Sequence, residues 1–243
     1  MLGPGESLSS IGTRVRQTSI GALLCSRLRD ALGADGCLIN GGGIRGARVY
    51  TTHLTYGDLE TELPFDNEAV VVSLPGQVVR DAVAASRRLA PVESGGFLQV
   101  DDGMAVDPVS RGVLAVGGAP LELYRLYRIA IMRGLLLGLD GVEPLVSYAR
   151  AHPELVPPAG SGRETKVILV ETFARSLWRS LGGFAEVDRD GDGRVTGSEV
   201  AAALSRVTGE PPSEIAANLV VRALDADGDA TISPDDGDGP IRR

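Results

Sequence analysis

The chain has 243 residues, enough for one large domain or for one domain and a small module. Hydrophobic residues make up 43% of it and aromatic residues only 4%, so a sizeable core must consist mainly of aliphatic side chains. The formal net charge is −8, and the acidity is concentrated between residues 184 and 238, where 13 acidic residues accompany 4 basic ones. This balance argues against nucleic acid as a partner and favours a hard cation.

The N-terminal residues do not combine a charged segment with an apolar stretch, so we expect no signal peptide in this chain. The longest apolar stretch is interrupted by Arg133 and Asp140 and is too short and too charged to cross a membrane. We therefore expect no membrane span, and the localisation stays open. Cys25 and Cys37 are too few for a disulfide framework and are expected to be buried thiols.

Helix-like and strand-like segments alternate in the first part of the chain. Thr18 and Ser19 can cap a helix, because apolar residues follow them at helical spacing. The other predicted elements are a strand at 37–39, a strand at 69–74, a helix after Pro75-Gly76 and a strand at 124–132. This mixture predicts an α/β fold in which helices cover a mixed sheet.

The last part of the chain is predicted to be a small all-α module. Residues 157–162 form a loop or linker, and residues 172–187 are predicted to be one helix. Pro211 and Pro212 are expected just inside the start of a further helix. We therefore divide the chain into a domain at 8–170 and a module at 171–243.

Residues 188–199, with the sequence DRDGDGRVTGSE, match the whole pattern of an EF-hand loop. Gly193 stands where the loop needs a sharp turn. The predicted calcium ligands are Asp188, Asp190, Asp192, the carbonyl of Arg194, Thr196 and Glu199. The alternative is an acidic turn without an ion, but carboxylates held so close repel each other unless a cation lies between them. Val195 is expected to pair with a partner loop.

A second acidic loop, at residues 225–236, follows the first at an interval of 37 residues. Its position six is Ala230 instead of glycine, and its last position is Asp236 instead of glutamate, which is one methylene longer. The candidate ligands are Asp225, Asp227, Asp229, Thr231, Ser233 and Asp236. The alternative is a structural partner that supports the first loop. Calcium is the predicted cofactor of this pair of hands.

A glycine-rich turn, Asn40-Gly41-Gly42-Gly43-Ile44-Arg45, follows the strand at 37–39. Glycines allow a close backbone approach and expose N–H groups, and an adjacent arginine can hold an anion through two parallel hydrogen bonds. Taken alone, this turn could either bind an anion or be a tight structural turn.

The stretches LINGGGIR, LTYGDLETELPFDN, VVVSLPGQVVRDAV and GGFLQV occur in this order. From about Arg14 to about Trp178 the chain thereby resembles the C-terminal domain of the 5′-nucleotidase family. The resemblance implies recognition of a nucleotide or nucleoside, with Phe65 stacking on the base. From the residues alone, Phe65 would be interpreted as a core aromatic residue. The implied substrate-binding residues are Arg14 (with Arg16 as the alternative), Asn40, Gly42, Gly43, Arg45, Phe65, Asn67 and Asp140.

The sequence departs from the family in two ways. The family's GGDG motif and following aromatic correspond here to residues 138–142, with Leu139 and Val142 at the changed positions, so the base would have one aromatic wall. Family catalysis belongs to an N-terminal metallophosphatase domain with two metal ions, and His53 and His152 are too few to build such a centre.

The resemblance therefore implies nucleotide recognition in phosphate-ester hydrolysis, with catalysis supplied by a separate metallophosphatase domain or chain. The alternative is a non-catalytic, calcium-binding interaction protein with a relic nucleotidase domain. The family is largely periplasmic or extracellular.

Overall fold

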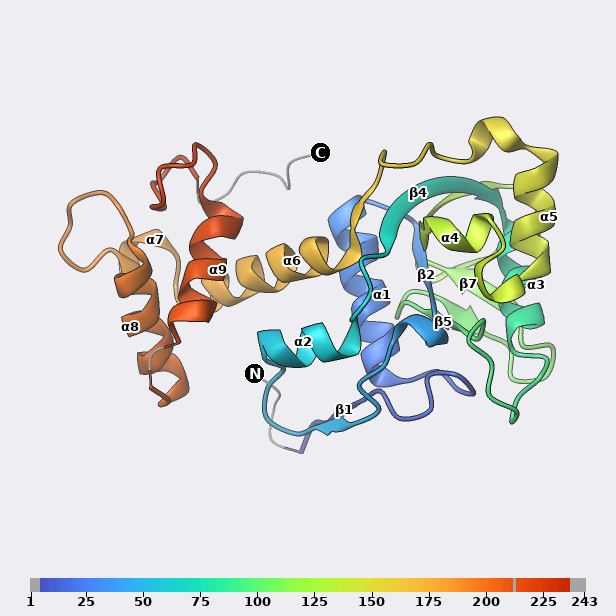
Figure 1. The fold of residues 1–243 in the computed structure, drawn as a ribbon, viewed down its shortest axis with the longest axis horizontal. Coiled ribbons are helices and arrows are strands. Elements are labelled where there is room, and N and C mark those ends of the chain that lie inside the picture. The colour runs from blue at the N-terminus through green and yellow to red at the C-terminus, as the bar shows by residue number, and fades with distance from the viewer. Residues whose placement is uncertain (1–4, 212, 237–243) are drawn as a thin grey trace. The chain divides into compact units, whose positions relative to one another are not determined.

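The computed structural model describes residues 5–211 and 213–236 (Figure 1). The contacts within the chain divide it into two compact units, residues 1–167 and residues 168–243. Each unit is described by itself below. Within the described part of the chain, every helix is too short or too polar to cross a lipid bilayer, in agreement with the prediction.

The first unit is built on a five-stranded mixed sheet, which confirms the predicted class of fold. The strands β2 and β9 are parallel, and the other neighbours are antiparallel. In sheet order the strands are β10 (Arg163–Glu164), β4 (Glu68–Pro75), β9 (Leu126–Met132), β2 (Gly36–Asn40) and β5 (Leu98–Val100). The predicted strands at 37–39, 69–74 and 124–132 correspond to β2, β4 and β9.

Helices α1 (Ser19–Leu32) and α3 (Gly76–Ser86) begin where the sequence predicted. Thr18 caps α1 by accepting a hydrogen bond from the Gly21 N–H at 3.1 Å, which confirms its predicted role. Figure 1 shows α1 running beside β2, and the apolar residues of α1 are buried.

Short elements complete the first unit. The strands are β1 (Leu8–Ser9) paired with β3 (Val49–Tyr50), and β6 (Ala105–Val106), β7 (Val113–Val116) and β8 (Ala119–Pro120) in a small sheet. The helices are α2 (Tyr56–Glu62), α4 (Arg133–Leu136) and α5 (Glu143–Ala151), and the single 3₁₀ turns are η1 (Gly41–Gly43), η2 (Leu139–Gly141) and η3 (Pro153–Leu155).

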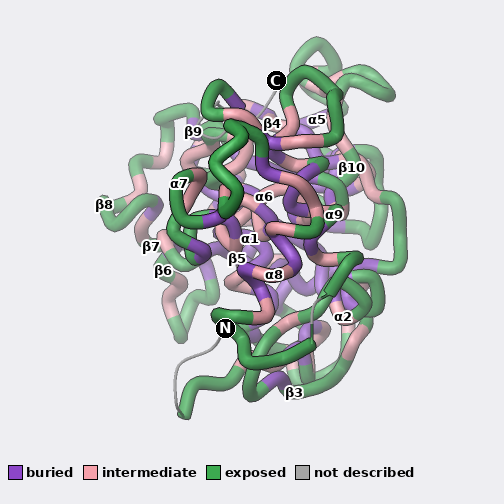
Figure 2. Tube along the Cα trace, turned by 90° about the vertical axis from the view of Figure 1, so that its left-hand side faces the viewer, coloured by how far each residue is buried: buried purple, intermediate pink, exposed green. Residues whose placement is uncertain are grey.

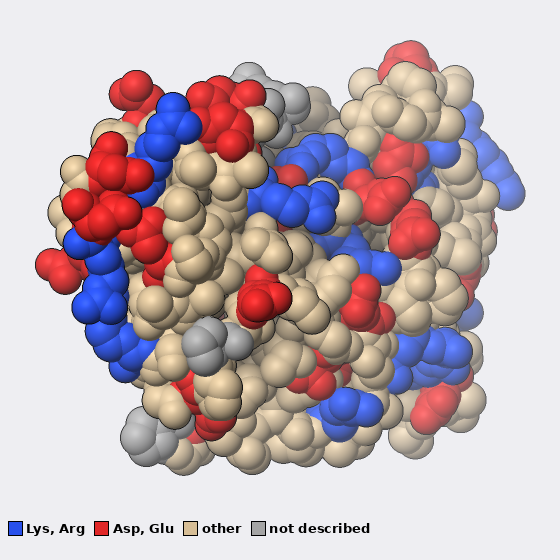
Figure 3. All heavy atoms as spheres, turned by 60° about the vertical axis from the view of Figure 1, so that its left-hand side comes forward, with Lys and Arg blue, Asp and Glu red and all other residues tan. Residues whose placement is uncertain are grey.

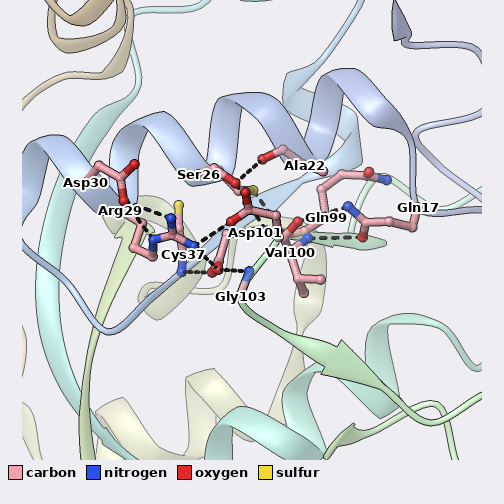
Figure 4. Close-up of polar contacts among 12 residues, drawn as sticks. Gln17, Ala22, Ser26, Arg29, Asp30, Cys37, Gln99, Val100, Asp101 and Gly103 are labelled. Carbon is pink, nitrogen blue, oxygen red and sulfur yellow. Dashed lines mark hydrogen bonds and ion pairs between the residues drawn. The ribbon is translucent and has the colours of Figure 1, made fainter. Parts of the chain in front are cut away.

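A buried carboxylate ties α1 to the sheet (Figure 4). Asp101, which is 2% exposed, accepts hydrogen bonds from the backbone N–H groups of Cys37 and Gly103 at 2.7 and 2.9 Å and from Arg29 Nη1 at 2.7 Å. The arginine lies on α1, while Cys37 lies on β2. Both cysteines are free and buried, as expected, and burial raises the pKa of the Cys25 thiol.

The second unit differs from the prediction at two helix boundaries. The single helix predicted for 172–187 is wrong, because Gly182 and Gly183 have φ angles of 97° and 81° and separate α6 (Thr165–Ser180) from α7 (Phe184–Val187). Proline just inside a helix is also wrong, since Ser213 caps α9 (Glu214–Leu224); Pro212 itself lies outside the described residues. Helix α8 (Gly197–Thr208) lies between the two acidic loops.

An apolar cluster forms the core of the second unit. Trp178, only 4% exposed, joins this cluster from the C-terminal half of α6. Figure 2 shows α8 and α9 alternating between buried and exposed residues, as amphipathic helices do. The other large members are Leu181, Val187, Val195, Val200, Leu204, Val220, Val221, Leu224 and Ile232.

The Asp101 network yields a stability prediction. Asp101→Ala leaves two backbone N–H groups without their acceptor and removes the one buried carboxylate among the three that pair with Arg29, so we expect it to lower the free energy of unfolding by about 2–4 kcal/mol. Asp102→Ala is the matched control, because Asp102 is 69% exposed and binds the same Arg29 nitrogen at the same 2.7 Å. It should cost at most about 1 kcal/mol. Urea denaturation measures both, and equal losses would contradict the assignment.

Candidate functional site

Two backbone turns approach each other too closely for side chains at the end of β2. The Gly41 N–H donates to the Phe97 carbonyl at 2.7 Å, and the Gly42 N–H donates to the Gly95 carbonyl at 2.8 Å. A Cβ atom at Gly42 would lie 3.0 Å from Gly95 Cα, and one at Gly41 would lie 2.1 Å from the Thr13 carbonyl oxygen. The glycines were predicted to permit a close backbone approach, and in the structure the approaching partner is the backbone of Thr13, Gly95 and Phe97.

Asn40 and Asp140 are 100 residues apart in the sequence but are directly bonded. Asn40 is 3% exposed, and its Nδ2 donates to Asp140 Oδ2 at 2.7 Å, which fixes the orientation of the amide. In the described part of the chain, Asn40 Oδ1 has no hydrogen-bond donor. Asp140 is exposed and has a φ of 59°, a conformation that costs a non-glycine residue about 1–3 kcal/mol. An unpaired buried oxygen next to a strained carboxylate indicates a functional site.

Gly95 and Gly96 belong to this site, although the sequence analysis did not assign them. A Cβ atom at Gly95 would lie 2.7 Å from Asp140 Oδ1, and one at Gly96 would lie 2.8 Å from the Asp140 carbonyl oxygen. Two adjacent glycines directly before the buried strand β5 were the available signal.

Arg45 and Phe65 lie together on the surface. Arg45 Cζ is 5.7 Å from the centroid of the Phe65 ring, within cation–π range, and Arg45 Nη1 is 3.4 Å from the Gly42 carbonyl oxygen. Phe65 is 47% exposed, so it is not a core aromatic residue. Asn67 is placed differently: its carbonyl accepts hydrogen bonds from the N–H and the hydroxyl of Thr165. Among the described residues, its side chain makes no hydrogen bond with the other candidates.

The two alternative arginines differ in availability. Arg16 donates from Nε and Nη2 to the Ile11 carbonyl at 3.0 and 2.9 Å, so much of its guanidinium is already occupied. Arg14 is anchored through its carbonyl, which accepts from the Ser94 N–H at 3.0 Å, and its side chain has no hydrogen-bond partner within the described ranges. This difference favours Arg14.

Glu62 fixes the loop that carries Arg45, a role that the sequence analysis missed. The carboxylate is fully buried; it accepts from Ser10 Oγ and from the Tyr50 hydroxyl at 2.6 and 2.7 Å, and from the Gly46 N–H at 2.9 Å. The Glu62 carbonyl accepts from the Arg45 N–H. Burial and the bond to Glu62 raise the pKa of Tyr50.

Val142 stands where the resemblance placed an aromatic wall. It is 3% exposed, and its Cγ2 lies 3.5 Å from the position of a Cβ atom at Gly96. Val142 therefore packs against the turn that contains Gly96. Leu139, the other changed position, is 43% exposed.

In the two acidic loops, backbone N–H groups at six equivalent positions donate to equivalent carboxylates. Carboxylate oxygens of Asp188, Asp190 and Asp192 lie within 4.8 Å of one another, and those of Asp225, Asp227 and Asp229 do the same. Acidic side chains gather at one end of the face shown in Figure 3. Val195 and Ile232 exchange two backbone hydrogen bonds of 2.8 and 2.9 Å, as expected for Val195.

The last residue of each loop is bound in the same way. Glu199 accepts from the N–H groups of Arg189 and Thr196 at 3.0 and 2.9 Å, and Asp236 accepts from those of Ala226 and Ser233 at 2.8 and 2.9 Å. Burial opposes ionisation, but these N–H groups lower the pKa of Glu199.

The predicted strain at position six of the second loop is present, because Ala230 has a φ of 66° where Gly193 has 83°. The side chain of Arg194 bonds to Asp229 Oδ2 at 3.0 Å across the two loops.

Neither histidine belongs to one of these acidic triplets. Within the described residues, the groups able to hold a metal are the two triplets, and neither contains a histidine. His53 is exposed, and His152 Nδ1 lies 3.6 Å from Glu154 Oε1.

Comparisons with known proteins agree with this fold and with the motifs. Residues 4–147 match the model of the family described as 5′-nucleotidase, C-terminal domain. Protein UshA of Yersinia enterocolitica is 32% identical over 146 residues, which cover 56% of this chain and 25% of that protein. A 5′-nucleotidase of Vibrio vulnificus is 29% identical over 138 residues, which cover 56% of this chain and 24% of that protein.

Among solved structures, the NAD nucleotidase of Haemophilus influenzae matches with a TM-score of 0.53 at 17% identity, covering 72% of this chain and 34% of that one, a likeness of fold alone. The fold and the family model thus define a domain of the 5′-nucleotidase C-terminal type. The chain belongs to the family of 5′-nucleotidase C-terminal domains. It spans about a quarter of the length of the curated relatives that it matches.

The glycine contacts yield a second stability prediction. Gly41→Ala should lower the free energy of unfolding by about 1–3 kcal/mol, because its methyl group meets the Thr13 backbone. Gly57→Ala is the matched control, since Gly57 lies in α2 with open space around its Cβ position, and should be neutral or stabilising by up to about 1 kcal/mol. Thermal unfolding compares them, and an equally stable Gly41→Ala protein would contradict the close approach.

Proposed function

We propose that residues 8–170 recognise a nucleotide or nucleoside that undergoes phosphate-ester hydrolysis. The observation that carries the proposal is the bonded pair of Asn40 and Asp140, with its unpaired amide oxygen, beside the exposed Arg45–Phe65 pair. The names of the relatives, 5′-nucleotidase and NAD nucleotidase, point to the same class of ligand.

Each group of the site suits one part of a nucleotide. Arg14 and Arg45 supply positive charge for phosphate. The Asn40 Oδ1 atom and the Asp140 carboxylate can accept hydrogen bonds from the hydroxyls of a ribose. Phe65 offers its ring to the base, a contact worth about 1–3 kcal/mol. In the ligand-free arrangement the Arg45 guanidinium lies near this ring, so a base would stack against Phe65 either beside or in place of that guanidinium.

Hydrolysis itself would need a metal centre of another kind. The acidic triplets offer only oxygen ligands, which suit calcium. A dinuclear phosphatase centre combines histidine and carboxylate ligands instead. We therefore assign catalysis to a metallophosphatase domain outside these 243 residues, and the present residues to substrate recognition.

For residues 171–243 we propose a pair of EF-hands that binds calcium. The first loop would use Asp188, Asp190, Asp192, the Arg194 carbonyl, Thr196 and Glu199, and the second Asp225, Asp227, Asp229, Thr231, Ser233 and Asp236. Trp178 already occupies the apolar cluster of this unit, which favours a stabilising ion over a switch that opens a groove.

The second candidate function is a calcium-binding interaction protein with a relic nucleotidase domain. The burial of Val142 favours it, because only Phe65 then remains as an aromatic wall for a base.

Nucleotide titration separates the two functions. By isothermal titration with AMP, adenosine and a UDP-sugar, we expect the wild-type chain to bind at least one of them and Arg45→Ala to bind the phosphate-bearing ligand at least about tenfold more weakly. Arg48→Ala is the matched control: Arg48 lies three residues away, is exposed and pairs with Asp58 at 3.3 Å. It should bind like the wild type.

Absence of heat with every ligand, or equal affinity in both arginine variants, would reject nucleotide recognition by this site. AMP hydrolysis by the purified chain with added divalent metal, lost in Asn40→Ala, would instead contradict the assignment of catalysis to another domain.

Calcium removal tests the C-terminal module. An ion present at about 100 times its dissociation constant stabilises the folded state by about 2.7 kcal/mol, so a chelator should lower the melting temperature by at least about 4 °C. Glu199→Gln should lose most of this response, and Glu210→Gln, an exposed glutamate outside both loops, should keep it. Identical melting curves with calcium and with chelator would count against a structural ion.

A further inference from the structure

A hollow of about 320 Å³ lies apart from the Asn40–Asp140 pair. Its walls come from residues 15–17, from the end of α3 and from the loop after β6. The residues that matter are Arg16, Gln17, Arg87, Phe97, Asp107 and Arg111. Three arginines face one aspartate on these walls, so the lining is positive.

Arg87 is a buried cation that forms no ion pair with any residue that the structure describes. It is 9% exposed, and its Nη2 donates to Gln17 Oε1 and to the Leu98 carbonyl, both at 3.0 Å and both uncharged acceptors. Its Nε has no acceptor in the described part of the chain, and its Cζ lies 4.9 Å from the centroid of the Phe97 ring. Burial lowers the pKa of Arg87 to about 10. An unpaired buried charge is costly, and an anion would relieve that cost.

The other two arginines keep donors available beside it. Arg16 uses Nε and Nη2 on one carbonyl oxygen, and Arg111 donates only from Nη1, to the Arg87 carbonyl oxygen. Neither forms an ion pair within the described residues. Arg111 also has a φ of 62°, an uncommon conformation for a side chain of its size.

Asp107 offsets only part of this positive charge. Its carboxylate accepts from the Val109 N–H and the Ser110 hydroxyl, each at 2.9 Å, within its own turn. These bonds, chiefly the one from the Val109 N–H, lower the pKa of Asp107. Three guanidinium groups therefore face one carboxylate, and the lining keeps an excess of positive charge.

We propose that this hollow binds a small tetrahedral oxyanion of the phosphate class, either inorganic phosphate or the phosphate group of a small organic ester. Guanidinium groups match phosphate oxygens in geometry and charge, and three of them line one hollow here. The proposal does not rest on nucleotide binding, because the Asn40–Asp140 pair and Arg45 do not line this hollow.

The hollow is connected to the candidate nucleotide site through the backbone. Gln99 Nε2 donates to the carbonyl oxygens of Thr13 and Arg16 at 2.8 and 2.7 Å, and so fixes both ends of the segment that includes Arg14. An anion held by Arg16 would act on the segment that presents Arg14 to the other site.

Phosphate titration at constant ionic strength tests the proposal. We expect inorganic phosphate to bind the wild-type chain, and the double variant Arg16→Gln/Arg111→Gln to bind it at least about tenfold more weakly. Arg111→Gln alone should show part of the loss. Arg88→Gln is the matched control, because Arg88 follows Arg87 directly, is exposed and does not line the hollow. It should bind phosphate like the wild type.

Two further arms distinguish the possible results. Arg45→Ala should leave phosphate binding unchanged. Binding of glycerol phosphate as well as free phosphate would indicate a site open to esters, and binding of free phosphate alone would indicate a site for the ion. Either result of this comparison supports the proposal. Loss of phosphate binding in Arg45→Ala but not in the double variant would show that phosphate binds at the nucleotide site instead. That result, or no binding at about 10 mM phosphate, would overturn the proposal. Circular dichroism of each variant confirms that it is folded.

Discussion

The contact between the glycines of η1 and the turn at 94–97 is the constraint on which the first unit depends. With no Cβ at Gly41 and Gly42, β2 can end against the backbone of Phe97 and Gly95 and also of Thr13. This packing places Asn40 in a buried position from which its amide reaches Asp140. A methyl group at Gly41 would push away the segment that carries Arg14, and one at Gly42 would crowd Gly95. The site is therefore built by backbone contact before any ligand-binding side chain is considered.

Two buried carboxylates perform comparable work at different places in this unit. Glu62 gathers donors from Ser10, Tyr50 and Gly46 and thereby shapes the loop of Arg45, while Asp101 joins α1 to β2. In each case the acceptor is satisfied mainly by uncharged or backbone donors, which makes burial tolerable. Arg87 is the contrasting case, since among the described residues no carboxylate forms an ion pair with it.

The sequence predicted the parts of the structure that depend on local patterns. Apolar periodicity and the cap at Thr18 located α1, and continuous apolar runs located β2, β4 and β9, because these signals act within a few residues. The same periodicity continued across Gly182 and Gly183 and concealed the break between α6 and α7. Glu62 and the Asn40–Asp140 bond could not be predicted, because their partners come from distant segments that only the fold brings together.

An ion site in an acidic loop has two separate requirements, and a comparison of the two loops distinguishes them. The first is a backbone shape, and both loops have it: Ala230 adopts the left-handed conformation of Gly193, and Asp236 holds the same two N–H groups as Glu199 despite its shorter side chain. The second is the ability of side chains to reach an ion, and here the loops differ. Asp236 is one methylene shorter than Glu199, although each carboxylate accepts from two N–H groups and one hydroxyl, and Asp229 shares its charge with Arg194. We infer that any difference in affinity between the loops would come from the reach and charge of these carboxylates rather than from the backbone.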